Sequence, residues 1–207
     1  MQPSPKGDAD LPNLQQSLKL VEEVIRLKQA VYISGDGLPI TFQTHVLAMQ
    51  ADQLVLTNQI RPPYISSFMA SKSFSLQVGM VRFQSDKILS DGEHMVFPLR
   101  KDSIIEETRQ SERFYFNADE RVIVEILNPF DNETKISKSV MDMSATGLSL
   151  RTTFDSMLFQ PDTYLGNFRI LVDGELYKKG AGRVVYRRKL MDVSGHLRHQ
   201  VGIKFES

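Results

Sequence analysis

Two arginines four positions apart, Arg109 and Arg113, are the first residues of this chain whose types and spacing suggest binding chemistry. Each guanidinium is a planar fork of hydrogen-bond donors. It can grip a phosphate with two bonds, meet the acceptor edge of a guanine, or stack on a base. A guanine nucleotide therefore suits the pair. Taken alone, two arginines in a connecting segment more commonly form a solvated charge cluster.

A second group of residues follows in the hexapeptide Asp142-Met-Ser144-Ala-Thr-Gly147. Because residues two apart on a strand share a face, Asp142 and Ser144 should project together, with Met141 and Met143 on the other side. A carboxylate can accept from guanine N1 and N2, or orient an arginine that makes the contact, and a hydroxyl can donate to a phosphate. Gly147 would let the backbone turn or approach a ligand closely. Alone, the hexapeptide more commonly marks a Ser or Asx turn at a strand end.

The elements that must position these residues are predicted to be mostly strands. One amphipathic helix comes first, with apolar side chains at helical spacing at Leu14, Leu18, Val21 and Ile25. We expect it to pack on the sheet that follows. Segments of strand length then continue to position 103, and tight turns are predicted at Asp36-Gly37 and Asp91-Gly92.

The second half contains six segments of strand length: RVIVEIL, KISKSVMDMS, GLSLRT, YLGNFRILV, GRVVYRR and QVGIKF. Turns at Asp173-Gly174 and Ser194-Gly195, and the absence of intervening helical patterns, predict a small antiparallel barrel. The charge-dense stretch RKDSIIEETRQSER separates the halves, and Ser103 with Glu106 forms a possible capping box. The predicted fold is mainly all-β, with two small antiparallel barrel domains and a short N-terminal helix. The predicted divisions are a disordered tail at 1–12, an N-terminal β domain at 13–103, a linker at 104–113 and a six-stranded barrel at 114–207.

The order of the two motifs, Arg-x-x-x-Arg and then Asp-x-Ser-x-x-Gly, resembles the paired signature of the PilZ family. The strands Gly182–Arg187 and Val201–Phe205 resemble the end of that domain, so the similarity covers approximately residues 108–207. The resemblance implies a six-stranded barrel that binds cyclic di-GMP on its outside. It further implies that the arginines contact phosphate and guanine, and that the base pocket is lined by Asp142, Ser144 and Gly147.

Three further positions, Thr108, Arg151 and Arg187, are candidate secondary contacts. In some relatives an arginine directly precedes the arginine motif and favours a stacked ligand dimer. Thr108 occupies that position in this chain, so the sequence leaves open whether one or two ligand molecules bind. The N-terminal domain is similar in layout to that of flagellar-brake proteins. This similarity implies a receptor that relays ligand level to a protein partner, such as the flagellar motor, through a domain rearrangement that controls motility.

The composition and the absence of certain motifs argue against several other classes of function. The 25 basic and 25 acidic residues cancel, which argues against a general attraction to DNA, and there is no cysteine for a disulfide or a thiolate metal site. No catalytic motif and no membrane span is recognisable, so we expect a cytoplasmic protein that is not an enzyme and holds no metal or cofactor besides its ligand. The alternative is a barrel that acts as a ligand-independent interaction module. It could also bind single-stranded nucleic acid through the basic stretch Lys178–Lys189.

Overall fold

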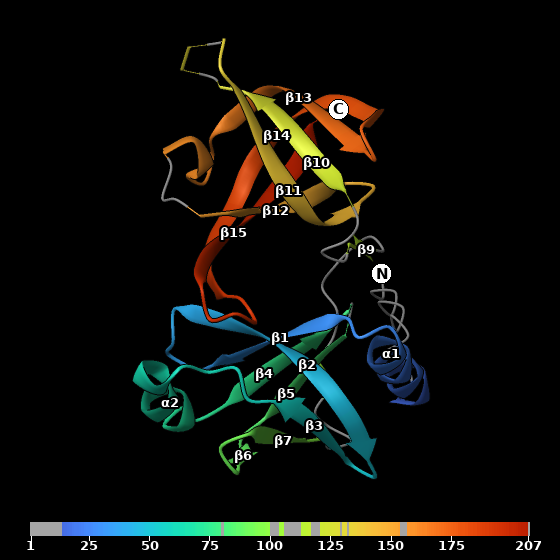
Figure 1. The fold of residues 1–207 in the computed structure, drawn as a ribbon, viewed down its shortest axis with the longest axis vertical. Coiled ribbons are helices and arrows are strands. Elements are labelled where there is room, and N and C mark those ends of the chain that lie inside the picture. The colour runs from blue at the N-terminus through green and yellow to red at the C-terminus, as the bar shows by residue number, and fades with distance from the viewer. Residues whose placement is uncertain are drawn as a thin grey trace, which may run out of the picture.

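The chain folds into two β-rich halves, one above the other in Figure 1. The computed structural model describes residues 14–79, 81–99, 104–105, 113–116, 121–128, 130–131, 133–153 and 157–206. Two predicted ligand contacts, Thr108 and Arg109, lie outside these residues, as does the predicted tail at 1–12. Within the described part of the chain, no helix has the length and apolar character that crossing a bilayer requires.

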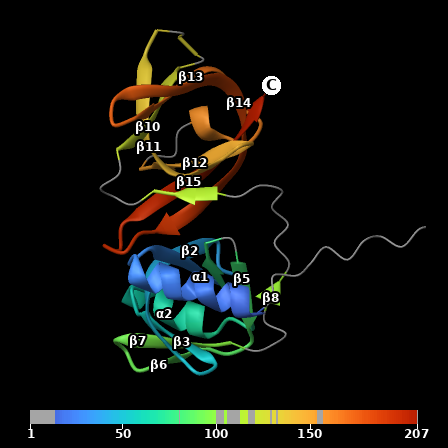
Figure 2. The same ribbon diagram turned by 90° about the vertical axis from the view of Figure 1, so that its right-hand side faces the viewer.

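The N-terminal half is an antiparallel sheet in the order β8-β5-β4-β1-β2-β3-β7-β6. Its elements are α1 (Leu14–Arg26), β1 (Ala30–Gly35), β2 (Ile40–Gln50), β3 (Gln53–Thr57), α2 (Pro62–Met69), β4 (Phe74–Val78), β5 (Val81–Ser85), β6 (Leu89–Ser90), β7 (His94–Pro98) and β8 (Ile104–Ile105). The predicted first helix is confirmed, and it buries Val21 and Val24 in the core of this half. Figure 2 shows α1 lying beside the strands of the N-terminal half.

Helix α2 was not predicted from the sequence. Pro62 and Pro63 occupy its first turn, where proline's fixed φ suits a helix and its missing N–H has no helical partner to lose. The helix is held by Phe68, which is fully buried with its ring centroid 5.6 Å from Phe42 and 5.1 Å from Phe74. Tertiary packing, with Tyr64 also against Phe42, therefore stabilises a helix too short to form alone.

The C-terminal half is the closed six-stranded antiparallel barrel that the strand pattern predicted. Its strands run in the order β10-β11-β12-β15-β14-β13, and β13 pairs again with β10. The elements are β9 (Arg113–Tyr115), β10 (Val122–Leu127), β11 (Lys135–Ser144), β12 (Gly147–Thr152), the 3₁₀ turn η1 (Met157–Phe159), β13 (Tyr164–Val172), β14 (Glu175–Met191) and β15 (Leu197–Glu206). Strand β9 lies outside this ring and pairs with β11.

The two halves are joined by an arm of the barrel, which we define as the turn and strand ends at residues 189–197. The end of β14 pairs in parallel with β2, placing Met191 opposite Phe42 and inside the N-terminal core. At the tip of the arm, the Arg61 side chain donates to the carbonyl of Ser194 at 3.2 Å. Figure 1 shows the arm reaching from the barrel to β1 and β2. One continuous hydrogen-bonded sheet therefore runs through both halves.

The connecting segment differs from one expectation. Ile104 and Ile105 form β8 on the edge of β5, so no helix begins there, although Ser103 and Glu106 themselves lie outside the described residues. The N-terminal sheet thus extends two residues beyond position 103. Two separate hydrophobic cores, one in each half, agree with a two-domain chain, while the limits at 103 and 114 stay predictions.

Candidate functional site

Asp142 is a buried carboxylate on the outer side of the barrel wall, with 4% of its surface exposed. One of its oxygens is paired with the Arg113 guanidinium from β9, and the other accepts from the hydroxyl of Ser149 on β12. A buried charge is expensive unless it is paired and hydrogen-bonded, and here both conditions hold. The Arg113–Asp142 pair is the arrangement that the second of the two roles considered for this carboxylate requires, and the contact of that arginine with a ligand stays a prediction.

The polar chain continues across the barrel to β14. The Gln200 amide donates to the Ser149 hydroxyl at 2.9 Å and lies 3.5 Å from the second oxygen of Asp142. Its own carbonyl accepts from the Arg188 guanidinium at 2.7 Å. We call these five residues, Arg113, Asp142, Ser149, Gln200 and Arg188, the Asp142 network. Each member fixes the next, so the arginines at both ends are held in defined positions.

Arg113 remains positively charged in this environment. Burial acts to lower the pKa of its guanidinium, but the charge and the hydrogen bond of Asp142 outweigh burial and raise the pKa overall. About a fifth of the side chain, 21%, stays exposed. The donors that are not used on Asp142 are therefore available to an anion or to a guanine edge.

A β-bulge corrects the expected facing of the methionines. The pairing of β11 with β12 shifts register between Val140 and Asp142, which leaves Met141 as an extra residue. The side-chain alternation therefore changes at this point. Met143 joins the barrel core as expected, whereas Met141 lines a cavity between the halves instead of sharing the face of Met143. Sequence alternation alone cannot anticipate a bulge, because the inserted residue breaks the period of two.

Ser144 and Gly147 shape the turn between β11 and β12. The Ser144 hydroxyl accepts from the N–H of Thr146 and donates to the carbonyl of Gly147, both at 3.3 Å. A Cβ at position 147 would collide with the backbone carbonyl of Ile203 on β15. The turn considered from the sequence is therefore present, and the close approach at Gly147 in this structure is to the backbone of β15, while an approach to a ligand stays a prediction. The register places Ser144 opposite Arg113, so the turn adjoins the Asp142 network.

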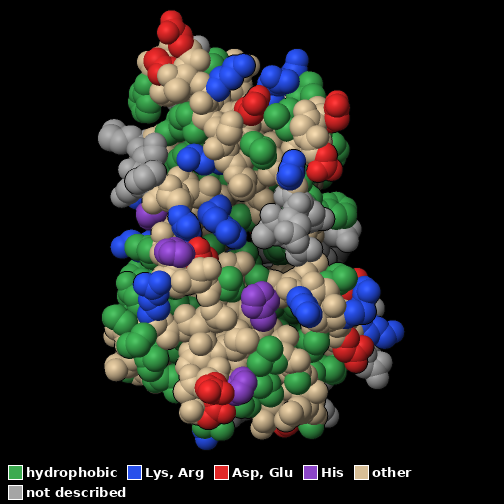
Figure 3. All heavy atoms as spheres, in the orientation of Figure 1, with side chains coloured by type: hydrophobic (Ala, Val, Ile, Leu, Met, Phe, Trp, Pro, Cys, Tyr) green, Lys and Arg blue, Asp and Glu red, His purple; other side chains and the backbone are tan. Residues whose placement is uncertain are grey.

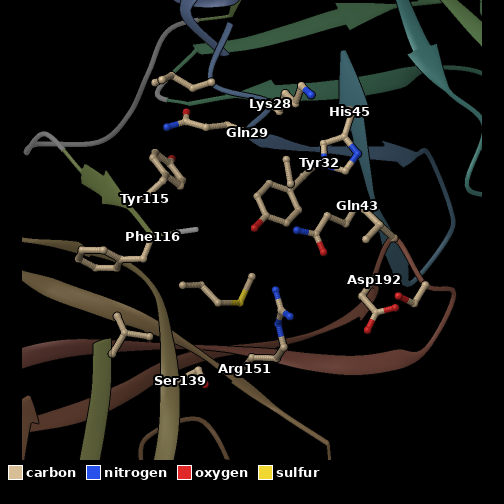
Figure 4. A pocket seen from close by; sticks show the side chains of 16 residues that line it. Lys28, Gln29, Tyr32, Gln43, His45, Tyr115, Phe116, Ser139, Arg151 and Asp192 are labelled. Atoms are coloured by element: carbon tan, nitrogen blue, oxygen red, sulfur yellow. The ribbon is translucent and has the colours of Figure 1, made fainter. Parts of the chain in front are cut away.

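Next to the network, a cavity of about 620 Å³ lies between the two halves. Its walls come from both, and Figure 4 labels Lys28, Gln29, Tyr32, Gln43, His45, Tyr115, Phe116, Ser139, Arg151 and Asp192. Tyr115 closes one side, because its hydroxyl donates to the carbonyl of Gly79 across the interface at 2.7 Å. Volumes of roughly 300–1,000 Å³ are usual for small-molecule sites.

The electrostatics of the cavity favour an anion. Lys28, Arg151 and His45 contribute positive or titratable groups, and on the face drawn in Figure 3 Lys, Arg and His side chains gather where the halves meet. The acid, Asp192, is already bonded: burial acts to raise its pKa, but the N–H of His196 and the Arg198 guanidinium lower it overall. Local charge can thus attract an anion although the whole chain is neutral.

Burial changes two further groups that line this cavity. It lowers the pKa of His45, so the imidazole is more readily neutral. It also raises the pKa of Tyr32, and the nearby Asp142 carboxylate raises it further, so the phenol keeps its proton and can donate. Together with Gln43, these groups give the N-terminal wall donors and acceptors that no sequence motif announced.

The structure separates the predicted residues into three groups. Arg113 and Asp142 are in direct contact, and Arg151 lines the cavity a short way along β12. Arg187 lies beside His199, whose pKa is lowered first by burial and then by the charges of Arg187 and Lys189. Since consecutive strand residues point to opposite faces, it is the neighbouring Arg188 that belongs to the network. Arg109 and Thr108 lie outside the described residues.

Several members of the site were missed by the sequence reasoning. Ser149 was one of them, although it alternates, together with the predicted Arg151, with the apolar residues of GLSLRT, which was a usable signal for a polar outer face. The positions of Gln200, Tyr32 and Gln43 had no such signal. They depend on which strands become neighbours and on how the two halves meet.

The basic stretch Lys178–Lys189 is divided between several contacts. Lys178 lies over the Phe205 ring at 4.0 Å, Arg183 pairs with Glu206 at 3.0 Å, and Arg188 is a member of the Asp142 network. It does not form one basic face. In the described ranges, no cluster of three or more acidic or histidine side chains could hold a metal ion.

Solved structures share this arrangement of two β-rich halves. The K. pneumonia MrkH–c-di-GMP complex matches with a TM-score of 0.64 at 13% identity, covering 91% of this chain and 84% of that one. A structure of MrkH described as a c-di-GMP-dependent transcription regulatory factor matches with a TM-score of 0.55 at 14% identity, covering 93% of this chain and 83% of that one. YcgR from Escherichia coli in complex with c-di-GMP matches with a TM-score of 0.51 at 8% identity, covering 98% of this chain and 88% of that one.

The barrel beside a β-rich N-terminal half, which the resemblance implied for this chain, is confirmed as a fold by these likenesses. At identities this low, the likeness establishes a shared fold. No family model matches the chain.

Proposed function

We propose that this protein is a cytoplasmic receptor for cyclic di-GMP, which binds against the Asp142 network and in the adjoining cavity. The observation that carries the proposal is the Arg113–Asp142 pair, a charged and partly exposed arginine fixed by a buried carboxylate. Such an arginine is oriented before the ligand arrives, so little conformational entropy is lost on binding. Arg113, Asp142, Ser144 and Gly147 are the proposed site residues of the described chain, and Arg109 is the second proposed arginine.

The size and charge of the cavity support a dinucleotide. Its volume of about 620 Å³ is large for a single phosphate or a metal ion. Its basic and aromatic lining, with Arg151, Tyr115 and Phe116 among the walls, suits a ligand that carries both phosphates and bases. The fold is also the one found in MrkH and YcgR bound to c-di-GMP.

We further propose that binding is relayed to a protein partner by a change in how the two halves meet. The cavity has walls from both halves, so a ligand that fills it contacts both and can favour one arrangement over another. Motility is the process that the resemblance to flagellar-brake proteins suggests. The fold alone does not select an output, since the same fold occurs in a transcription regulatory factor.

Calorimetric titration of nucleotide-free protein with cyclic di-GMP tests the proposal, with cyclic di-AMP and GTP as controls. We expect a dissociation constant from below micromolar to low micromolar, about 8 kcal/mol or more of binding free energy. Small-angle scattering and amide exchange on the same samples test the relay, and both should change with ligand. A flat titration at tens of micromolar would refute the receptor. Binding with unchanged scattering and unchanged exchange at the interface would refute the relay alone.

The ligand-independent interaction module is favoured by one observation. Both oxygens of Asp142 already have partners within the protein, so the network is complete without any added molecule. A barrel that had lost its ligand could keep this network for stability. The same flat titration, together with pull-down of a partner that is insensitive to cyclic di-GMP, would support this alternative.

A further inference from the structure

The wall of the cavity that comes from the N-terminal half carries polar groups without partners. Gln43 is 92% buried, with 8% of its surface exposed, yet its amide forms no hydrogen bond with any described residue. Because the side chain lines the cavity, its amide donors and acceptor are open to a bound molecule. Figure 4 shows this side chain within the cavity, where a bound molecule would meet it.

Two more side chains meet Gln43 in the same space. Tyr32 lies directly opposite Gln43 in the pairing of β1 with β2, so both project from one face of the sheet. Arg151 comes from the barrel on the other side, and it makes no hydrogen bond or ion pair with the residues that the structure describes. Figure 4 shows all three directed toward a common region.

The chemistry of this cluster suits a planar base better than a phosphate. A phosphate accepts only, and it would use the donors of Arg151 while leaving the carbonyl of Gln43 without a donor. A guanine presents both kinds of group: O6 and N7 accept, and N1 and N2 donate. The amide of Gln43, which donates and accepts, can then be satisfied together with the guanidinium, and the Tyr32 ring adds a flat apolar surface.

Cyclic di-GMP has two guanines, and the Asp142 network is at one side of the cavity. Resting on the function proposed above, we propose that the cavity holds the second guanine, bound by Gln43 and Tyr32 of the N-terminal sheet and by Arg151 of the barrel. The N-terminal half is then part of the ligand site. These three residues also make the site selective, because adenine places an amino donor where guanine has O6, and that donor opposes the donors of Arg151.

The test compares Gln43→Leu and Arg151→Met with a matched control, Gln84→Leu, whose side chain is exposed on β5 of the same half. Calorimetry should show cyclic di-GMP binding weakened about 10- to 100-fold by each cavity variant, the effect of losing a good base contact, and unchanged by the control. Arg151→Met should also reduce the preference over cyclic di-AMP, because it removes the donors that oppose the adenine amino group. Tyr32→Phe, which keeps the ring, should weaken binding less.

A second set of measurements distinguishes a lost contact with the ligand from a folding defect. Since Gln43 has no hydrogen-bond partner among the residues that the structure describes, Gln43→Leu should melt at the wild-type temperature or above it. In the wild type, cyclic di-GMP should slow amide exchange in residues 30–33 and 42–45. The inference is overturned if wild type binds and Arg113→Ala does not, while both cavity variants bind normally and these strands gain no protection. If the wild type itself fails to bind, the receptor proposal has failed instead.

Discussion

The two walls of the interdomain cavity differ in how complete they are. On the barrel side, the Asp142 network joins Arg113 to Arg188 through partners that are already bonded. On the N-terminal side, Gln43 lines the cavity and has no hydrogen-bond partner among the described residues. The barrel side is therefore organised by the network beside the cavity before a ligand arrives, whereas the cavity lining, which includes Gln43 and Arg151, keeps hydrogen-bonding capacity that a ligand can use. An organised network beside unpaired hydrogen-bonding groups suits a site in which one side is fixed and the other gains its contacts when a ligand binds.

Arg113→Ala should produce the largest effect and break the organised wall. We expect a loss of roughly 2–4 kcal/mol of cyclic di-GMP binding, because a charged contact to the ligand disappears and Asp142 is left buried without its cation. Calorimetry measures the loss. Arg183→Ala is the control, since Arg183 is exposed and pairs with Glu206 elsewhere on the barrel. Normal binding by the Arg113 variant would remove this residue from the site.

Met191→Ala should loosen the arm that holds the two walls together. Met191 is 3% exposed within the N-terminal core, and truncating such a side chain costs about 2–4 kcal/mol of unfolding free energy. Urea unfolding gives the magnitude, and amide exchange at residues 40–42 shows whether the parallel pairing with β14 weakens. Met69→Ala, at a side chain 38% exposed on α2, is the control. Unchanged exchange at 40–42 would mean that the arm is docked by its other contacts.

Gly147→Ala should disturb the barrel wall without removing any polar group. The new methyl would meet the carbonyl of Ile203, and a backbone neighbour can yield only if β12 and β15 separate. We expect a destabilisation of about 1–3 kcal/mol by thermal unfolding, as for other overpacked sites. Gly166→Ala is the comparison, because there the nearest atom, 3.3 Å away, belongs to the exposed side chain of Tyr164. Equal melting temperatures for the two variants would show that the strands tolerate the methyl.

The smallest expected effect is the loss of folding stability at lower pH, to which His45 on the N-terminal side and His199 on the barrel side both contribute. Burial lowers the pKa of both His45 and His199 from 6.5, so the unfolded chain takes up protons at a higher pH than the folded one. Stability should therefore fall as pH decreases through 6.5 and level off below the folded pKa values. Thermal melts between pH 7.5 and 5.5 should show less pH dependence in His45→Gln. An anionic ligand beside His45 should also reduce it, and a pH dependence identical with and without ligand would contradict that contact.

Much of the barrel could be predicted because its signals are local. Alternation along residues such as Val122, Val124 and Ile126 predicts a strand from the burial of one face. The turn at Asp173-Gly174 was predicted from glycine's tolerance of positive φ, and Gly174 has φ of 89°. The contact of Arg113 with Asp142 agrees with the role of an arginine orienter that the residue types allowed.

Other features had no local signal. The bulge at Met141 depends on how β11 aligns with β12, and α2 depends on a pocket for Phe68 that distant strands build. Strand β14 continues past the predicted GRVVYRR to Met191, where it pairs with β15 and, in parallel, with β2. Such pairings join strands that are distant in the chain, so the local sequence pattern does not predict them.

The sequence by itself determined which segments become strands and where several of them turn, and it predicted the chemistry of the arginine and Asp-x-Ser-x-x-Gly motifs. These properties follow from side-chain periodicity, glycine conformation and donor geometry, all of which act over a few residues. Only the tertiary structure decided that Ser149 and Gln200 complete the network, and that Gln43 and Tyr32 face Arg151 across a cavity. The reason is physical: these contacts join residues far apart in the chain, and they exist only after two separate cores have formed and docked.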